Sequence, residues 1–384
     1  MNVSINYPAR VQKLQTLLAR EGLDAYVASR FSSLSYLAGV FIPWRSAVVV
    51  PRSGQPVGIW WERDYSRIVQ DGWMSQNIAW GADPDWHEAI AGVLEDQGAG
   101  QGRVAFEFRA AGGRVAMGIL HAFEYQELLA RLPQVEMSDG CPLLDQVMLI
   151  KEKQEIALLR QAAAIADAGF LAAREALRPG VSENHVAGVA EAAMRDLGNE
   201  FNWSQSGGTE VGSGHRTAYL GGVTQPATQK IIQDGDNIIL DLHPMYRLYM
   251  ADACYNLVVG KAGAEQRRLA GVWEKAVETL LAQSCPGVAI SAAAKAAYQV
   301  FEEAGLGEYG LRAFGHGLGV DTRVTPSIGP GNDSLFQENM VIAAGAHLYV
   351  PGVGGMRLEL PTLITADGAE PLCRFAQEVH LISG

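Results

Sequence analysis

The first part of the chain alternates compact apolar runs with segments in which apolar residues recur at helical spacing. Residues 9–22 carry apolar side chains every three or four positions and stop at Gly22, which predicts a helix. Three apolar runs predict strands and two later amphipathic stretches predict helices: 24–29, 46–51, 56–61, 86–98 and 116–132. This alternation indicates an α/β domain. Gly140 and Pro142 punctuate its end, so the first domain is assigned to residues 1–147.

Residues 148–384 follow a different pattern and form the second expected domain. A long amphipathic helix is predicted over 151–177, and Ser182 is the expected N-cap of the next helix. A helix pair is predicted over 264–305. Strands are expected in five stretches rich in apolar residues: 231–246, 248–260, 340–350, 355–365 and 375–383. Helices interleaved with hairpins indicate an α+β domain around a curved antiparallel sheet.

The composition narrows the classes of partner. The 384 residues are 48% hydrophobic and carry a formal net charge of −12, with a pI near 5.2. Nucleic acids and anionic membranes attract clustered Lys and Arg, so neither is expected as a partner. No apolar run approaches the ~20 residues of a membrane span, and the N-terminus lacks the apolar core of a secretory signal. The four cysteines form no C-x-x-C pair, which favours reduced thiols in the cytoplasm: Cys141, Cys254, Cys285 and Cys373.

Four residues of the second domain have side chains that commonly bind metals. Asp241 and Glu359 lie inside apolar runs, Asp252 follows eleven residues after Asp241, and His316 is flanked by glycines. A buried carboxylate without a partner costs several kcal/mol, so it must be paired or bind a cation. Each residue alone could belong to a structural salt bridge. Together they form the oxygen and imidazole ligand set of Mn, Fe, Co or Zn sites.

The motifs around these residues resemble the pita-bread superfamily of Xaa-Pro peptidases, methionine aminopeptidases and creatinase, the M24 group. The resemblance covers nearly the whole chain and rests on segments in the family order: "SYLAGV", "KEKQEIALLRQAAAIAD", "SGHRTA", "DGDNIILDL", "YMADACYNLVVG", "GHGLG" and "GMRLELPTLIT". It implies an α/β creatinase-like N-terminal domain with a strand at 35–40, and an α+β pita-bread domain that carries the chemistry. It also implies a small-molecule substrate and a homodimer.

The sequence departs from the family pattern at three places. The family's metal site uses two Asp, one His and two Glu, and the position of one Glu falls on Gly345 in "VIAAGAHLY". A family histidine before the "DGD" segment falls on Gly221 or, with another gap, on Thr224. A second family histidine falls on Arg323. These departures predict an activity that differs from that of an ordinary prolidase.

Two other histidines could compensate for the missing ligand. Residues two apart on a strand share a face, so His347 faces the same way as Gly345, and His243 the same way as Asp241. A core histidine at His347, and a solvent-facing strand end at His243, are the alternatives. The hypothesis is a rebuilt site of six residues: Asp241, His243, Asp252, His316, His347 and Glu359.

The implied cofactor is one or two divalent ions of Mn, Fe, Zn or Co. Added imidazole favours a softer or redox-active ion, such as Fe, Zn, Ni or Cu, over Mn. Loss of a bridging carboxylate weakens a two-metal clamp and favours a single ion.

Four residues are candidates for substrate binding. His215 and Arg216 lie on a loop near the expected pocket, and Arg323 carries a planar donor fork suited to a carboxylate. Structural ion pairs are the alternative for both arginines. Trp44 lies in "FIPWRS", which resembles the N-domain loop that covers the partner's pocket in creatinase-type dimers; plain surface is its alternative.

The function expected from these residues is metal-assisted hydrolysis of a C–N bond in a small amino-acid derivative. Proton transfer is assigned to His347, His243 or Glu359, with Arg323 as an anchor. Three alternatives stay open. They are a metal-dependent lyase acting on a small zwitterionic carboxylate, a metal-free creatinase-like hydrolase, and a non-catalytic binding protein. Without a cation, Asp241 and Asp252 would be two close carboxylates, one with a strongly raised pKa.

Overall fold

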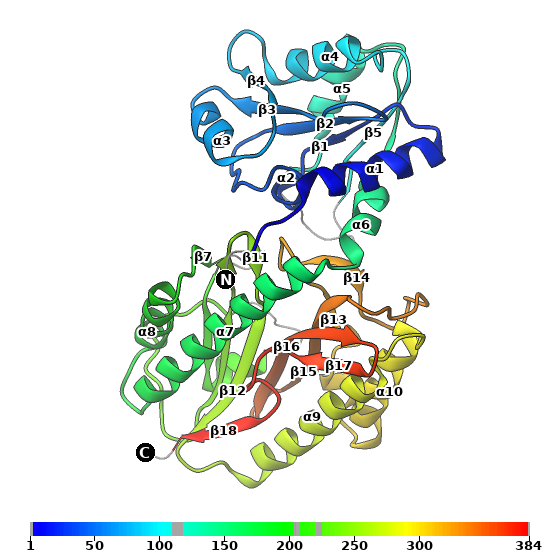
Figure 1. Cartoon of the computed structure of the whole chain (residues 1–384). Coiled ribbons are helices and arrows are strands. Elements are labelled where there is room, and N and C mark those ends of the chain that lie inside the picture. The colour runs from blue at the N-terminus through cyan, green and yellow to red at the C-terminus, as the bar shows by residue number, and fades with distance from the viewer. Residues whose placement is uncertain (1–2, 110–117, 203, 205–207, 220–224, 383–384) are drawn as a thin grey trace. The chain divides into compact units, whose positions relative to one another are not determined.

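The computed structural model describes residues 3–109, 118–202, 204, 208–219 and 225–382 (Figure 1). Two compact units divide the chain, one over residues 2–148 and the other over residues 149–384. The positions of Gly221 and Thr224 lie outside the described residues.

The N-terminal unit is built on one mixed sheet with the strand order β4-β3-β2-β1-β5-β6. The central strands β1 and β2 pair antiparallel, whereas β1 and β5, β3 and β4, and β5 and β6 pair parallel. The strands are β1 (Ala25–Ala28), β2 (Ala47–Pro51), β3 (Val57–Trp61), β4 (Gln76–Trp80), β5 (Arg103–Phe106) and β6 (Glu136–Asp139). The three strands predicted from apolar runs are therefore confirmed.

The described residues of this unit form six helices, and their ends follow local sequence signals. The first helix ends at Gly22, whose left-handed backbone (φ 68°) suits glycine. The helices are α1 (Tyr7–Glu21), α2 (Phe31–Ala38), α3 (Tyr65–Asp71), α4 (Trp86–Asp96), α5 (Ala122–Arg131) and α6 (Cys141–Leu149). The strand expected at 35–40 is wrong, because residues up to Ala38 belong to α2 and Gly39 terminates that helix in the left-handed region. The α/β class of this unit is confirmed.

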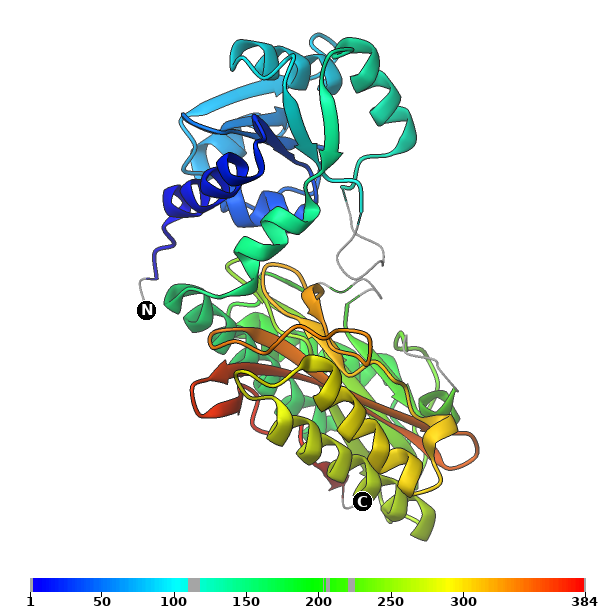
Figure 2. The same ribbon diagram turned by 90° about the vertical axis from the view of Figure 1, so that its right-hand side faces the viewer.

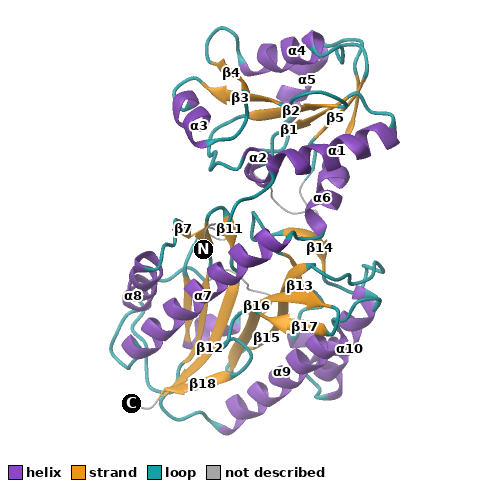
Figure 3. Ribbon diagram, in the orientation of Figure 1, coloured by secondary structure: helices purple, strands orange, loops and turns teal. Residues whose placement is uncertain are grey.

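In the part of the C-terminal unit that the structure describes, the strands form three sheets (Figure 3). Their strand orders are β11-β10-β7, β18-β12-β9-β8 and β14-β13-β15-β16-β17. The strands of the first two sheets are β7 (Phe201–Asn202), β8 (Glu210–Ser213), β9 (Asn237–Leu242), β10 (Pro244–Tyr246), β11 (Tyr249–Met250), β12 (Ala253–Val259) and β18 (Val379–Ile382). The strands of the third are β13 (Gly315–Gly317), β14 (Val324–Ser327), β15 (Val341–Val350), β16 (Gly354–Thr365) and β17 (Gly368–Pro371). Pairing is antiparallel except between β12 and β18, so the α+β fold is confirmed with one parallel pair.

The helices of this unit are the predicted ones. They are α7 (Lys153–Ala176), α8 (Glu183–Asp196), α9 (Ala264–Gln283) and α10 (Ile290–Glu303), with short 3-10 turns η2 (Gly214–Ala218) and η3 (Gly307–Tyr309). The Ser182 side chain accepts a hydrogen bond from the His185 N–H, as expected of an N-cap. Figure 2 shows α9 and α10 lying side by side along the unit.

Helix α7 has the length and composition of a membrane-spanning helix, contrary to the expectation that no segment of the chain does. In the structure 56% of its apolar window is buried. The buried side chains include Ile156, Leu159, Ile165 and Phe170, and the last two belong to the apolar core of the C-terminal unit. The helix is therefore a core helix of this unit.

Candidate metal centre

Three strands and the segment just before a fourth bring four of the predicted ligands together. Asp241 lies in β9, and Asp252 lies just before β12, which pairs with β9. His316 lies in β13 and Glu359 in β16, both in the sheet that contains β15. Two overlapping groups result, each with ligand atoms within 4.8 Å of one another: Asp241, His243 and Asp252, and then Asp252, His316 and Glu359. Asp252 belongs to both groups, so it is the shared corner of the centre.

Two histidines are oriented by backbone carbonyls. The Nδ1 atom of His243 lies 2.7 Å from the Gly208 carbonyl oxygen, and Nδ1 of His316 lies 3.1 Å from that of Gly317. Nε2 of His243 faces Asp252 at 3.2 Å, and Nε2 of His316 faces it at 3.5 Å. This is the arrangement of metal-binding imidazoles, because the outer nitrogen fixes the ring and the inner one is left for the ion. The solvent-facing alternative for His243 is wrong, because its side chain is buried.

Several buried atoms of the centre lack hydrogen bonds. Among the described residues, no hydrogen-bond partner is found for His316 Nε2, Glu359 Oε2 or Asp241 Oδ1. His316 Nε2 and Glu359 Oε2 lie 3.6 Å apart. Buried polar atoms without partners are rare and require an explanation such as an ion. The carboxylate and imidazole donors therefore fit a divalent cation.

Two ionisable groups of the centre, Asp241 and His243, have raised pKa values. Burial raises the pKa of Asp241 to about 7, against the opposing charge of Arg357. Burial lowers the pKa of His243, but the charges of Asp241 and Asp252 outweigh it and raise that pKa to about 10. One raised carboxylate pKa is the outcome expected for the metal-free alternative as well, so these shifts do not exclude it.

The pKa values of His316 and Glu359 are lowered instead. Burial lowers the pKa of His316, and the nearby charge of Arg323 adds to this lowering. The lone pair of the neutral His316 ring is thus available to a cation. Burial opposes ionisation of Glu359, but the hydrogen bond and charge of His347 hold its pKa below the ordinary value.

His347 lies beside the position left empty by Gly345. Its Nε2 atom lies 3.2 Å from Glu359 Oε1, and it belongs to neither group of clustered ligand atoms. A Cβ atom added at Gly345 would lie 3.0 Å from His347 Cε1, and close to backbone atoms of Gly315 and Leu358. The imidazole therefore occupies the space toward which a side chain at 345 would extend. His347 contacts the centre through Glu359.

Two charged residues at the centre were missed from the sequence. The buried Arg357 donates from Nη1 to Glu210 Oε2 (3.0 Å) and forms an ion pair with Asp241, in which Nη2 lies 2.9 Å from Oδ2. The alternation of strand β16 could have revealed Arg357, because it lies two residues before Glu359 and shares its face. Glu210 opens strand β8 and has no comparable signal in the sequence.

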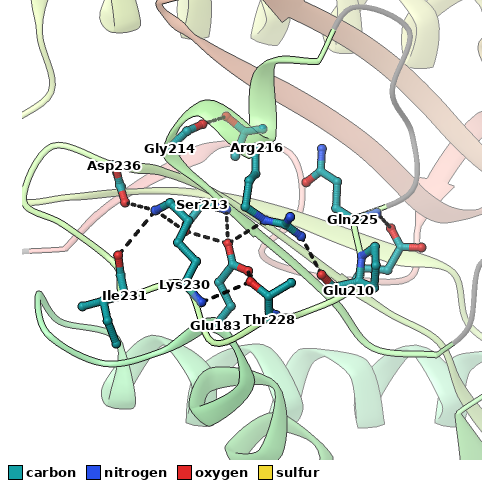
Figure 4. Close-up of polar contacts among 12 residues, drawn as sticks. Glu183, Glu210, Ser213, Gly214, Arg216, Gln225, Thr228, Lys230, Ile231 and Asp236 are labelled. Carbon is teal, nitrogen blue, oxygen red and sulfur yellow. Dashed lines mark hydrogen bonds and ion pairs between the residues drawn. The ribbon is translucent and has the colours of Figure 1, made fainter.

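The predicted substrate-binding residues fall in different surroundings. Figure 4 shows Arg216 beside Glu183, where its Nε atom lies 3.1 Å from Glu183 Oε1, and Nη2 donates to the Pro226 carbonyl. The ring of His215 packs edge-on against Tyr219. The structure thus places Arg216 in an ion pair.

Arg323 and Trp44 are placed differently. Arg323 is close enough to His316 to influence its pKa, and within the described residues no ion-pair partner is found for it. Trp44 belongs to the N-terminal unit, is 51% exposed and contacts the Trp61 ring at a centroid distance of 4.8 Å.

Both units match known protein families. Residues 157–366 match the model of metallopeptidase family M24, and residues 10–148 match the creatinase/prolidase N-terminal domain. A Xaa-Pro dipeptidase of Pyrococcus furiosus is 31% identical over 62% of this chain and 66% of its own length. A Xaa-Pro dipeptidase of Lactobacillus delbrueckii subsp. lactis is 23% identical over 97% of this chain and 98% of its own length.

A solved structure agrees in fold. The X-Pro aminopeptidase of Thermotoga maritima MSB8 superposes with a TM-score of 0.84 at 23% identity, covering 97% of this chain and 99% of that chain. The family match spans more than half of the chain and includes every residue of the two ligand groups. The chain therefore belongs to metallopeptidase family M24, a family of hydrolases that act on C–N bonds with divalent metal ions.

Proposed function

We propose that this protein hydrolyses the C–N bond of a small dipeptide or related amide with a free carboxylate. A divalent cation would be held by Asp241, Asp252, His316 and Glu359, with His243 at the edge of the same set. The observation that carries the proposal is the pair of overlapping ligand groups whose buried atoms lack partners. The dipeptidase names of the relatives support an amide substrate.

The cation, His347 and Arg323 have separate roles in the proposed reaction. When bound, a divalent cation supplies Lewis-acid polarisation of the scissile carbonyl. His347, hydrogen-bonded to Glu359, accepts the proton of the attacking water and returns it to the leaving nitrogen. Arg323 binds the substrate carboxylate through its planar donor fork.

Two departures from the family pattern support a substrate range wider than Xaa-Pro dipeptides. Gly345 leaves one side of the centre without a carboxylate, and Arg323 adds a fixed positive charge near His316. Substrate binding then depends more on a free carboxylate than on a proline ring. The choice among Mn, Fe, Zn and Co, the number of ions, the cytoplasmic location and the homodimer stay predictions. The comparisons do not support the lyase alternative.

The test is a substrate panel with metal-loaded protein. Xaa-Pro dipeptides, other dipeptides, their C-terminal amides and a β-substituted carboxylate are compared for the parent and for Arg323→Met. Loss of a charged hydrogen bond is expected to raise KM for free carboxylates about tenfold or more, with little change for the C-terminal amides. Arg312→Met is the matched control, because Arg312 is 66% exposed and packs over Tyr298.

Two outcomes would overturn the proposal. The first is elimination from the β-substituted carboxylate without hydrolysis of any dipeptide, which would assign the lyase activity. The second is an equal change in KM for free carboxylates and for amides, which would remove Arg323 from carboxylate binding.

A further inference from the structure

Glu210 is a buried acid that the proposed chemistry does not use. It lies in β8, where its backbone pairs directly with Asp241 in β9. Its side chain belongs to a residue that is 1% exposed, and burial of a carboxylate is costly unless both oxygens are compensated. The position next to a predicted metal ligand raises the question of what this charge does.

Arg357 connects Glu210 to the metal centre. One arm of its guanidinium, Nη1, lies 3.0 Å from Glu210 Oε2, and the other arm, Nη2, lies 2.9 Å from Asp241 Oδ2. The same Nη2 atom lies 3.5 Å from Glu359 Oε1. The Arg357 guanidinium thus bridges one acid outside the ligand groups, Glu210, and two acids inside them, Asp241 and Glu359.

The surroundings of Glu210 are not those of an optimised structural ion pair. In the described part of the chain, Glu210 Oε1 has no hydrogen-bond partner, and neither polar atom of the Gln225 amide has one. The backbone N–H of Gln225 donates to Glu210 Oε2 (Figure 4). A carboxylate kept at such a cost to stability is typical of a functional position.

Glu183 shows what a purely structural buried acid looks like in the same unit. Ser213, Arg216 and Thr228 supply five hydrogen bonds to its two oxygens (Figure 4). These bonds join the start of α8 to η2 and to the segment around Thr228. Glu183 is buried, like Glu210, but within the described residues it forms no hydrogen bond or ion pair with the predicted metal ligands.

We propose that Glu210 is a positioning residue of the metal centre. Its carboxylate holds one arm of Arg357 and offsets the guanidinium charge, while the other arm fixes Asp241 Oδ2. Asp241 then keeps a defined orientation, with Oδ1 directed to a cation. Because Glu210 balances the charge of Arg357, that charge does not cancel the negative charge of Asp241. This inference rests on the proposed function in one respect, because it requires that a divalent cation binds at all.

The experiment measures metal affinity in the metal-free full chain. Calorimetric titrations with Mn²⁺ and Zn²⁺ compare the parent, Glu210→Gln and the matched control Glu183→Gln. Removal of an outer partner of a metal ligand weakens binding by about 10-fold to 100-fold in known sites, so about tenfold weaker binding is expected for Glu210→Gln only. In an Arg357→Met background, Glu210→Gln should have little further effect, because its action runs through the guanidinium.

The outcomes separate this inference from the proposed function. If the parent binds neither ion, both fail. If the parent binds and Glu210→Gln binds within twofold of it, only the role of Glu210 fails. Equal weakening in Glu183→Gln would assign the effect to general destabilisation and also overturn it. Should Glu210→Gln not fold, Glu210→Thr, whose β-branched side chain suits a strand, replaces it in the same comparison.

Discussion

Two clusters of buried charge, one in each unit, differ in how completely their hydrogen bonds are satisfied. In the N-terminal unit, Glu107 accepts bonds from Tyr26, from the backbone of Ser29, and from both the backbone and the side chain of Arg30. Ser33 also donates to it. In the C-terminal unit, the cluster around Asp252 leaves His316 Nε2, Glu359 Oε2 and Asp241 Oδ1 without partners among the described residues.

The difference indicates which charges serve the fold and which serve the site. The Glu107 carboxylate joins β1 to the start of α2, and Arg30 extends the network to Asp145. It is complete without any further group. The Asp252 cluster is incomplete and collects acids from several strands at one point, which only a cation or a bound molecule would complete. Burial alone therefore does not distinguish a functional acid from a structural one, whereas missing hydrogen-bond partners do.

The largest expected effect comes from Asp252→Asn, because Asp252 belongs to both ligand groups. Metal content per chain, measured by plasma mass spectrometry, should fall to near background. Hydrolysis should fall by about 10³-fold or more, since metal polarisation contributes several kcal/mol. The thermal midpoint of the metal-free protein should not fall, because repulsion among the acids is relieved. If Asp252→Asn keeps full metal content, the contrast between the Asp252 cluster as a metal centre and the Glu107 network as part of the fold is wrong.

His347→Gln should have the next largest effect and sharpen the role of the histidine beside Gly345. Loss of a general base lowers kcat by about 10²-fold to 10⁴-fold, with metal content unchanged. Burst and steady-state kinetics, together with metal analysis, measure the two quantities separately. If the variant loses the metal instead, His347 is a ligand, as the sequence-based hypothesis of a six-residue site allows.

Glu107→Gln should affect stability and not the centre. Leaving Arg30 partly unpaired is expected to lower the free energy of unfolding by about 3 kcal/mol, measured by denaturant titration. Metal content per folded chain should stay the same. The exposed Glu95→Gln is the matched control in the same unit.

The same variant also has a predictable dependence on pH. Burial opposes ionisation of Glu107, but the charge of Arg30 and several donors hold its pKa below the ordinary value of 4.5. Its stabilising contribution is therefore complete above about pH 4.5 and declines as the pH falls below it. The parent should lose more stability on acidification than Glu107→Gln, and equal losses would argue against this network.

Sequence patterns predicted the parts of the fold that depend on local signals. The periodicity over 151–177 and the cap at Ser182 suffice for α7 and α8, because helices are specified by nearby residues. The strand expected at 35–40 came from the resemblance to the creatinase-like domain, and the structure has helix α2 there up to Ala38. The eight residues of α2 are too few for hydrophobic periodicity to have corrected that expectation.

The site was only partly predictable for a related reason. Asp241, Asp252, His316 and Glu359 stand out as polar residues in apolar or glycine-rich segments. Glu210 does not, because its neighbours across the sheet are distant in the sequence and only the register of β8 with β9 brings it to Asp241. Contacts of this kind depend on long-range pairing, which no local pattern records.

The pairing of β15 with β16 places Gly345 directly opposite Glu359, and His347 opposite Arg357. Because His347 Cε1 would lie 3.0 Å from a Cβ atom at 345, and backbone atoms of Gly315 and Leu358 lie at 3.2 and 3.3 Å, the two positions are not independent. A side chain at 345 therefore requires the imidazole and these backbone atoms to shift by a few tenths of an ångström. The effects of substitutions at 345 and at 347 are therefore expected to be non-additive, because each changes the space that is left to the other.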